Sequence, residues 1–175
     1  MDPLPHWIEP STPSSRFDMC QGIEQIAAIE GPVHLDVILQ RLRVSWNIGR
    51  VGPRIRANIE AAIGLANVVR VGGFVTVPER DGAAVRTPVA ECARTVEQVA
   101  DAELAAALLQ LVQASAGVTH DDLTSAVARL YGWNRRGPDI NARLNRLISD
   151  LVADGKLDST DHGFSAAQVQ GGDRA

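Results

Sequence analysis

The chain has 175 residues, of which 45% are hydrophobic and only 4% aromatic, and its formal net charge is −4. This composition allows packed cores made mostly of aliphatic side chains, and the acidic balance argues against nucleic-acid or membrane binding through overall positive charge. The two cysteines make no disulfide framework and have no metal-ligand spacing. Because no apolar run suggests a signal peptide or a membrane span, we expect a cytoplasmic protein.

The first half of the chain predicts three helices and a hairpin. Residues 1–18 are rich in proline and serine, which predicts a disordered N-terminal tail. Apolar residues then recur at helical spacing over residues 19–30 and 35–44. A third helix is expected to begin at Gly52-Pro53, because glycine is an accepted N-cap and proline fits the first helical position. Residues 68–77 read as two short strands joined by a Gly-Gly turn.

The second half repeats this order of elements. Helices are expected at residues 101–114 and 119–130, and a third helix begins at Gly137-Pro138. Short strands follow at residues 156–158 and 164–166, around a polar turn. Three helices closed by a hairpin are the order of a winged helix, which is a helix-turn-helix variant. We therefore predict a mainly α fold with small β-hairpins (α+β), built from two tandem winged-helix units.

The two halves also share sequence. Arg50–Ile63 and Arg135–Ile148 align without a gap and have Arg, Gly, Pro, Ile, Ala and a final Ile in common. Upstream, Trp46 matches Trp133 if two residues are deleted from the second copy. A repeat of this length suits a small domain rather than a solenoid. The predicted organisation is a tail at 1–18, unit 1 at 19–78, a linker at 79–97, unit 2 at 98–167 and a disordered tail at 168–175.

Arginines gather at the start of both predicted third helices, where the helix dipole disfavours cations. A phosphate held at the helix N-terminus would account for them, whereas pairing with nearby carboxylates is the alternative explanation. We expect phosphate contacts from both third-helix segments. The residues assigned to phosphates are Arg50, Arg54, Arg56, Arg135, Arg136, Arg143 and Arg146.

The third helix of unit 2 also offers candidates for reading bases. Asn141 and Asn145 are four residues apart with Arg146 beside them, so we expect all three on one outward face. Asparagine and arginine are the side chains that pair bidentately with adenine and guanine edges. In unit 1 the matching outward positions are expected to be Arg54, Arg56, Asn58 and Glu60.

Other polar motifs indicate structure rather than chemistry. His34 and His120 stand at matching positions, each two residues before an aspartate, and are expected to cap free N–H groups at a helix start rather than bind metal. Trp46 and Trp133 are expected to pack against the cores. We find no nucleophile–base pair and no phosphate-binding loop, so we predict no enzyme, no metal and no cofactor.

Part of the chain resembles a known family. Glu30–Leu42, Trp46, the Gly49-Arg50-x-Gly52 motif and Arg54-Ile55 look like a bacterial domain family of unknown function. That family is found near the C-terminal end of very large superfamily I helicase-like proteins, often with a Vsr-type nuclease domain. Residues 102–148 are similar to the segment that follows in those proteins. The resemblance implies a non-catalytic module in a DNA-processing or defence setting, and implies no catalytic residues here.

We therefore expect a helicase-associated, DNA-binding accessory module that contacts duplex DNA rather than single strands. A separate helicase or nuclease is an expected protein partner, and no membrane is expected. The alternative is a protein–protein adaptor that uses tandem winged helices as a scaffold without touching DNA. The two differ in surface chemistry, because a DNA-binding protein should present its arginines together, whereas an adaptor should expose an apolar patch.

Overall fold

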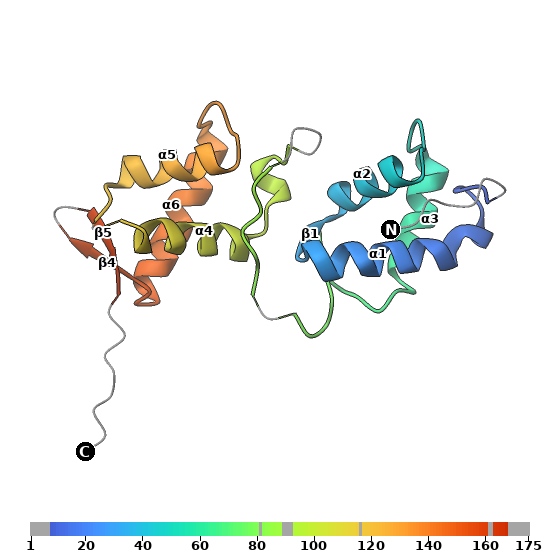
Figure 1. Ribbon diagram of the computed structural model, residues 1–175, viewed down its shortest axis with the longest axis horizontal. Coiled ribbons are helices and arrows are strands. Elements are labelled where there is room, and N and C mark those ends of the chain that lie inside the picture. Colours follow the sequence, from blue (N-terminus) through green and yellow to red (C-terminus); the bar gives the residue numbers. More distant parts are fainter. Residues whose placement is uncertain (1–7, 81, 89–92, 116, 161–162, 168–175) are drawn as a thin grey trace, which may run out of the picture. The chain divides into compact units, whose positions relative to one another are not determined.

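The computed structural model describes residues 8–80, 82–88, 93–115, 117–160 and 163–167. The chain divides into two compact units, unit 1 with Met1–Ala83 and Gln98–Ala100, and unit 2 with Ala84–Glu97 and Asp101–Ala175. Each is mainly helical with short antiparallel strands (Figure 1), which confirms the predicted α+β fold class. The predicted tail at 168–175 lies outside the described residues, as do residues 1–7.

Unit 1 is a three-helix core closed by a small sheet. Its elements are η1 (Pro13–Ser15), α1 (Arg16–Glu30), β1 (Val33–His34), α2 (Leu35–Ser45), α3 (Pro53–Ile63), β2 (Val69–Val71) and β3 (Phe74–Thr76). The strands pair antiparallel in the order β1-β3-β2, with Val33 opposite Val75. Strand β1 is absent from the sequence prediction because two residues carry no periodic signal. Helix α3 begins at Gly52-Pro53 as predicted.

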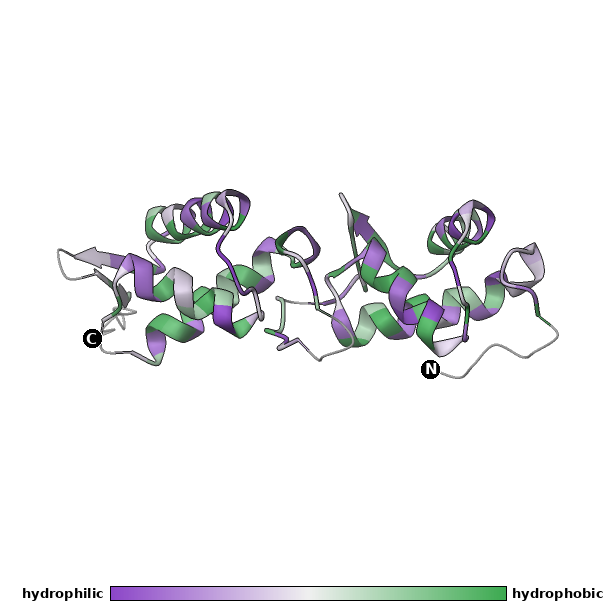
Figure 2. Ribbon diagram, turned by 90° about the horizontal axis from the view of Figure 1, so that it is seen from above, coloured by the Kyte–Doolittle hydropathy of each residue, from purple (hydrophilic) through white to green (hydrophobic). Residues whose placement is uncertain are grey.

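Aliphatic side chains fill this core, as the low aromatic content requires. Ile23 of α1, Ile38 and Leu42 of α2, and Ile59 of α3 are fully buried. Figure 2 shows that hydrophobic and hydrophilic residues lie on different sides of the helices. Burial of each such side chain contributes about 1.5–3 kcal/mol.

Unit 2 has the same order of helices with a two-stranded sheet. Its elements are η2 (Val96–Gln98), α4 (Asp101–Gln113), α5 (His120–Leu130), α6 (Pro138–Ala153), β4 (Leu157–Thr160) and β5 (Gly163–Ala166). A single antiparallel bridge between Val118 and Phe164 takes the place that β1 has in unit 1. The hairpin packs at the end of α6 (Figure 1). None of the helices in the described parts of either unit is long and apolar enough to cross a membrane.

The repeat has one constant register of 85 residues. Helices α1 and α4 begin at Arg16 and Asp101, α2 and α5 at Leu35 and His120, and α3 and α6 at Pro53 and Pro138. The third helices then differ, because α3 has 11 residues and α6 has 16. Unit 2 therefore extends its third helix beyond the point where that of unit 1 stops.

This register corrects the predicted match of Trp46 with Trp133. Trp46 and Tyr131 are the buried C-caps of α2 and α5. The next residues, Asn47 and Gly132, both have positive φ, 50° and 70°. The repeat therefore runs through this loop without a deletion, and the shared tryptophan letter misled the alignment.

The predicted match of His34 with His120 is corrected in the same way. His34 is the N-cap of α2, where its side chain accepts a hydrogen bond from the Asp36 amide. The N-cap of α5 is Thr119, which accepts from the Asp122 amide. His120 is consequently the first residue inside α5 and is not needed for capping.

The segment before α1 belongs to unit 1, although residues 1–18 were predicted to be a disordered tail. Asn58 of α3 is buried and donates hydrogen bonds to the carbonyls of Pro10 and Thr12, at 3.0 and 2.7 Å. Its side-chain oxygen accepts a 2.7 Å bond from Arg16 Nε. Asn58 was expected on the outward face of α3, and is instead an internal anchor for this segment.

The segment predicted as a linker, residues 79–97, is also packed against the units in its described parts. Arg80 donates to the carbonyls of Ala28 and Ile29 at the end of α1. Arg94 is buried in unit 2 and makes ion pairs with Glu103. At least these two arginines of the segment are therefore bound within the units.

Candidate nucleic-acid interface

An exposed arginine stands at the same position before each third helix. Arg50 and Arg135 are three residues ahead of Pro53 and Pro138, which open α3 and α6. Neither forms a hydrogen bond or an ion pair with any residue that the structure describes. Each helix start is capped by a glycine without a side-chain hydrogen bond. Amide groups and unpaired guanidinium groups near a helix N-terminus together favour an anion.

The two arginines in the first turns of α3 have different surroundings. Arg54 is exposed and has no polar partner within the described residues. Arg56 donates to Asp36 at 3.2 Å, and about half of each side chain is exposed. An exposed pair of this kind contributes little stability, but the carboxylate neutralises much of the charge that Arg56 would offer to a phosphate.

Arg136 is held more firmly within unit 2. It donates to the Asp121 carboxylate at 2.7 Å and to the Thr124 hydroxyl at 2.6 Å. Its backbone carbonyl accepts a 3.4 Å bond from Asn141. Arg136 and Asn141, both predicted to contact nucleic acid, therefore connect the loop before α6 to α5 and to α6 itself.

Arg143 and Arg146 share one carboxylate. Asp101 accepts from Arg143 and from Arg146, each at 2.6 Å, and Arg146 also pairs with Asp150 at 3.2 Å. Burial alone would raise the pKa of Asp101, but the hydrogen bonds from both arginines outweigh it and lower the pKa. These arginines join α6 to the start of α4.

The predicted base-reading group is separated by the structure. Asn145 is exposed and lies about 100° around the helix from Arg146, because one residue advances an α-helix by about 100°. Arg146 turns toward Asp101 and Asp150, whereas Asn145 and Ser149 face the hairpin. The expected joint surface of Asn141, Asn145 and Arg146 is not formed.

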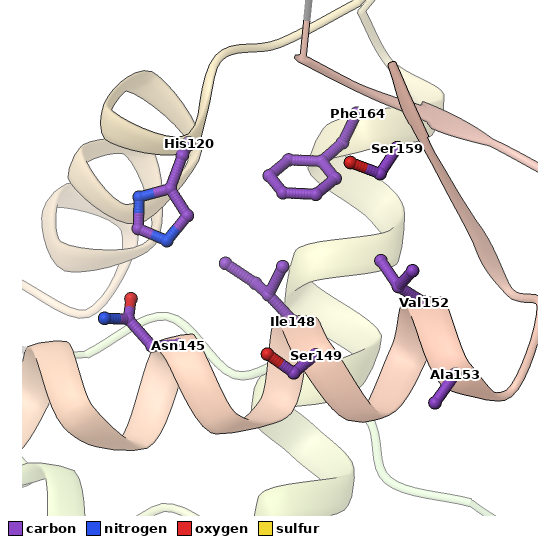
Figure 3. Close-up of a pocket in the computed structure, with 8 residues that line it drawn as sticks. All are labelled: His120, Asn145, Ile148, Ser149, Val152, Ala153, Ser159 and Phe164. Carbon is purple, nitrogen blue, oxygen red and sulfur yellow. The ribbon is translucent and has the colours of Figure 1, made fainter. Parts of the chain in front are cut away.

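Asn145 instead opens into a groove between α5, α6 and the hairpin, with a volume of about 550 Å³. Figure 3 shows the aromatic rings of His120 and Phe164 above α6, with Asn145 below His120. The remaining lining comes from Ile148, Ser149, Val152, Ala153 and Ser159. Sequence reasoning missed Phe164 and Ser159 here, because nothing local indicates which hairpin residues meet α6.

A buried charged cluster lies elsewhere in unit 2, formed by Arg86, Arg94, Glu103 and Tyr131. Glu103 is fully buried. Its carboxylate accepts hydrogen bonds from the side chains of Arg86 and Arg94 at 2.7–2.9 Å, and from the Arg86 amide at 3.0 Å. The Arg94 guanidinium lies 5.6 Å from the Tyr131 ring centroid. We call this group the Glu103 cluster, and all its polar groups face one another rather than a ligand.

We expect the Glu103 cluster to make the stability of unit 2 sensitive to acid. Burial alone would raise the pKa of Glu103, but the hydrogen bonds from Arg94 and Arg86 outweigh it and hold the pKa below its ordinary value of 4.5. A carboxyl group whose pKa is lower in the folded state than in the unfolded state stabilises the fold at pH values above its unfolded-state pKa. This stabilisation is lost as the pH falls through the folded-state pKa. We therefore expect the melting temperature of unit 2 to fall in that range. A carboxyl ¹³C titration that placed Glu103 at or above 4.5 would contradict this.

Of the two histidines expected to cap a helix, His34 does so and His120 does not. His34 caps α2, and its ring packs edge-on against Phe74 with centroids 5.2 Å apart. Within the described residues, no three His, Cys, Asp or Glu side chains gather as a metal site would require.

Comparison with known proteins adds one finding. No curated protein and no solved structure matches the chain. Residues 9–57 match the model of a family described as a protein of unknown function, DUF3320. The matched range begins in the segment that Asn58 anchors and ends within α3. Over residues 9–57 the chain is thus similar to that family of unknown function.

Proposed function

We propose that this chain is a non-catalytic, nucleic-acid-binding accessory module made of two winged-helix units. The observation that carries this proposal is the repeated pair Arg50 and Arg135, exposed, without a polar partner in the described chain, and at the same position before each third helix. Selection for stability alone gives no reason to place an unpaired cation where the helix dipole opposes it. A phosphate at each helix N-terminus supplies that reason.

The winged-helix assignment is supported by the topology of unit 1. Its first strand lies between α1 and α2, its other two strands follow α3, and the sheet order is β1-β3-β2. The third helix and the hairpin of such a unit are the parts that approach DNA. In unit 2 the same parts carry Asn145, Ser149 and the groove. A setting with a helicase or nuclease partner rests on the sequence resemblance of residues 30–55.

The interface proposed here is smaller than the set predicted from sequence. Arg50, Arg54 and Arg135 contact phosphates, and Asn145 contacts a base. The other arginine candidates are paired with aspartates, and Asn141 bonds the backbone of Arg136. With a net charge of −4, the isolated chain binds nucleic acid weakly, and its affinity falls as the salt concentration rises.

Replacing Arg50, Arg54 and Arg135 together is expected to abolish most of the salt dependence of duplex binding. The variant Arg50→Ala/Arg54→Ala/Arg135→Ala loses about 0.9 units in the slope of log K against log salt for each phosphate contact removed. Fluorescence anisotropy of a labelled duplex between about 50 and 200 mM salt measures this slope. The matched control, Arg56→Ala/Arg136→Ala/Arg146→Ala, removes the same charge from arginines that already have carboxylate partners.

The proposal predicts that the first variant weakens binding much more than the control. Equal loss in both would mean that only overall charge matters, and the assigned contacts would be wrong. Absence of binding by the unaltered chain at the lowest salt would overturn the nucleic-acid function itself.

A second candidate function, the adaptor, is favoured by one observation in unit 1. Strand β2 is at the edge of its sheet, and Val69 and Val71 on it are 42% and 70% exposed. An apolar edge strand can pair with a strand of another protein. If the chain is an adaptor, Val69→Lys and Val71→Lys should weaken its binding to the protein partner. Equal binding with and without these substitutions would contradict the adaptor function.

A further inference from the structure

The groove of unit 2 has an uncharged polar lining with an aromatic wall. The lining contains one amide, two hydroxyls and one imidazole, from Asn145, Ser149, Ser159 and His120, and neither a carboxylate nor a guanidinium. None of these four side chains forms a hydrogen bond with another residue described here. Phe164, Ile148 and Val152 supply apolar surface beside them. Such a lining suits a neutral, planar, polar ligand and gives no counter-charge to a phosphate.

The constant register of the repeat shows where the described parts of unit 1 and unit 2 differ at this place. In unit 1 the N-cap is His34, whose ring is committed to the Asp36 amide and packs closely against Gly73. In unit 2 Thr119 caps the helix, which leaves the ring of His120 facing Phe164 at 6.2 Å between centroids. The five additional residues of α6 then provide Ser149, Val152 and Ala153 as the floor.

We propose that this groove binds a single unpaired base of a nucleic-acid strand, a proposal that rests on the nucleic-acid function above. Phe164 stacks on a face of the base, the His120 ring, tilted by 56° from that of Phe164, contacts its rim, and Asn145 bonds its edge. Stacking on a side chain requires a base that has left its own stack, because paired bases in a duplex expose only their edges. An amide beside aromatic rings is a combination that recognises such unstacked bases.

The test compares two duplexes that differ only in one base. One has a single-nucleotide bulge, and the other has an abasic nucleotide at the same place, so that backbone, charge and flexibility are matched. We expect the unaltered protein to bind the bulged base about tenfold more tightly, which is the order that one stacked base contributes. Asn145→Ala and Phe164→Leu should each reduce this preference, because each weakens binding of the bulged duplex more than binding of the abasic duplex.

Control variants lie outside the groove. Asn134→Ala removes another exposed asparagine of unit 2, and Phe74→Leu removes the aromatic residue of the unit 1 hairpin; both should keep the full preference. Asn145 is exposed on a helix, so its replacement by alanine keeps the fold and tests the groove even if Phe164→Leu is unstable.

The outcomes separate the groove from the wider function. Equal affinity for both bulged duplexes, with salt-dependent binding that the arginine variant weakens, would overturn the groove proposal and leave nucleic-acid binding intact. Displacement of the bulged duplex by adenosine at a comparable concentration would identify a free nucleoside as the ligand and overturn the strand assignment. Failure to bind any duplex would overturn both proposals.

Discussion

Replacement of Glu103 by alanine is expected to lower the free energy of unfolding of unit 2 by about 3–5 kcal/mol. The carboxylate is fully buried between Arg86 and Arg94, of which Arg94 is itself buried. Without Glu103, the guanidinium of Arg94 remains in a low-dielectric interior with no counter-charge, and this accounts for most of the cost. Because small domains are stable by only about 5–15 kcal/mol, this loss removes a large part of the stability of unit 2.

Urea denaturation followed by circular dichroism measures this loss. Glu97→Ala is the control, because Glu97 is an exposed acidic residue close by in the sequence, and its replacement should change stability by no more than about 0.5 kcal/mol. Glu103→Gln keeps the shape and part of the hydrogen bonding, so we expect an intermediate loss. A loss for Glu103→Ala as small as that for the control would show that the cluster is not a structural element of unit 2.

Replacement of Asn58 by alanine is expected to lower the free energy of unfolding of unit 1 by about 3 kcal/mol and to release the segment before α1. Loss of the amide removes the partner of Arg16 and the donors to Pro10 and Thr12. A buried polar group left without its partner costs about 1–3 kcal/mol. The anchor joins residues more than 40 positions apart, so no local interaction replaces it.

Two measurements follow the release of this segment. Denaturation reports the stability of unit 1, and limited trypsin digestion reports cleavage after Arg16, which should become faster in Asn58→Ala. Asn67→Ala replaces an exposed asparagine and should leave both unchanged. If Asn58→Ala unfolded normally and resisted trypsin as well as the unaltered chain, residues 9–15 would not depend on Asn58.

The equivalent position in unit 2 shows how the anchor is preserved with different chemistry. Arg143 is 85 residues after Asn58, and it bonds Asp101, the first residue of α4. In unit 1 the arginine is the first residue of α1, and the acceptor lies on the third helix. The arginine donor thus lies on the first helix in unit 1 and on the third helix in unit 2, and the acceptor lies on the opposite helix in each case. The contact between the first and third helices is the same in both units. Arg143 therefore serves the fold, which explains its poor suitability for phosphate.

Local signals predicted the elements well. Helical spacing, the Gly-Pro starts of both third helices, and the Gly-Gly turn each depend on residues close in sequence, and each matches the structure. The composition of residues 1–18 led to the wrong expectation for the part that is described, because proline and serine also suit a tight turn such as η1. Whether this segment is disordered or packed depends on its hydrogen bonds with Asn58, and Asn58 lies far along the chain from it.

The fold class, the twofold repeat and the set of arginines near the third helices could all be predicted from sequence, because periodicity, capping and gap-free similarity are properties of neighbouring residues. Which of those arginines are free could not be predicted, since their partners Asp36, Asp101 and Asp121 come from other helices. The tertiary structure also places Asn145 with Phe164 rather than with Arg146. Charge pairing and groove formation depend on which helix faces which, and residues distant in sequence determine that arrangement.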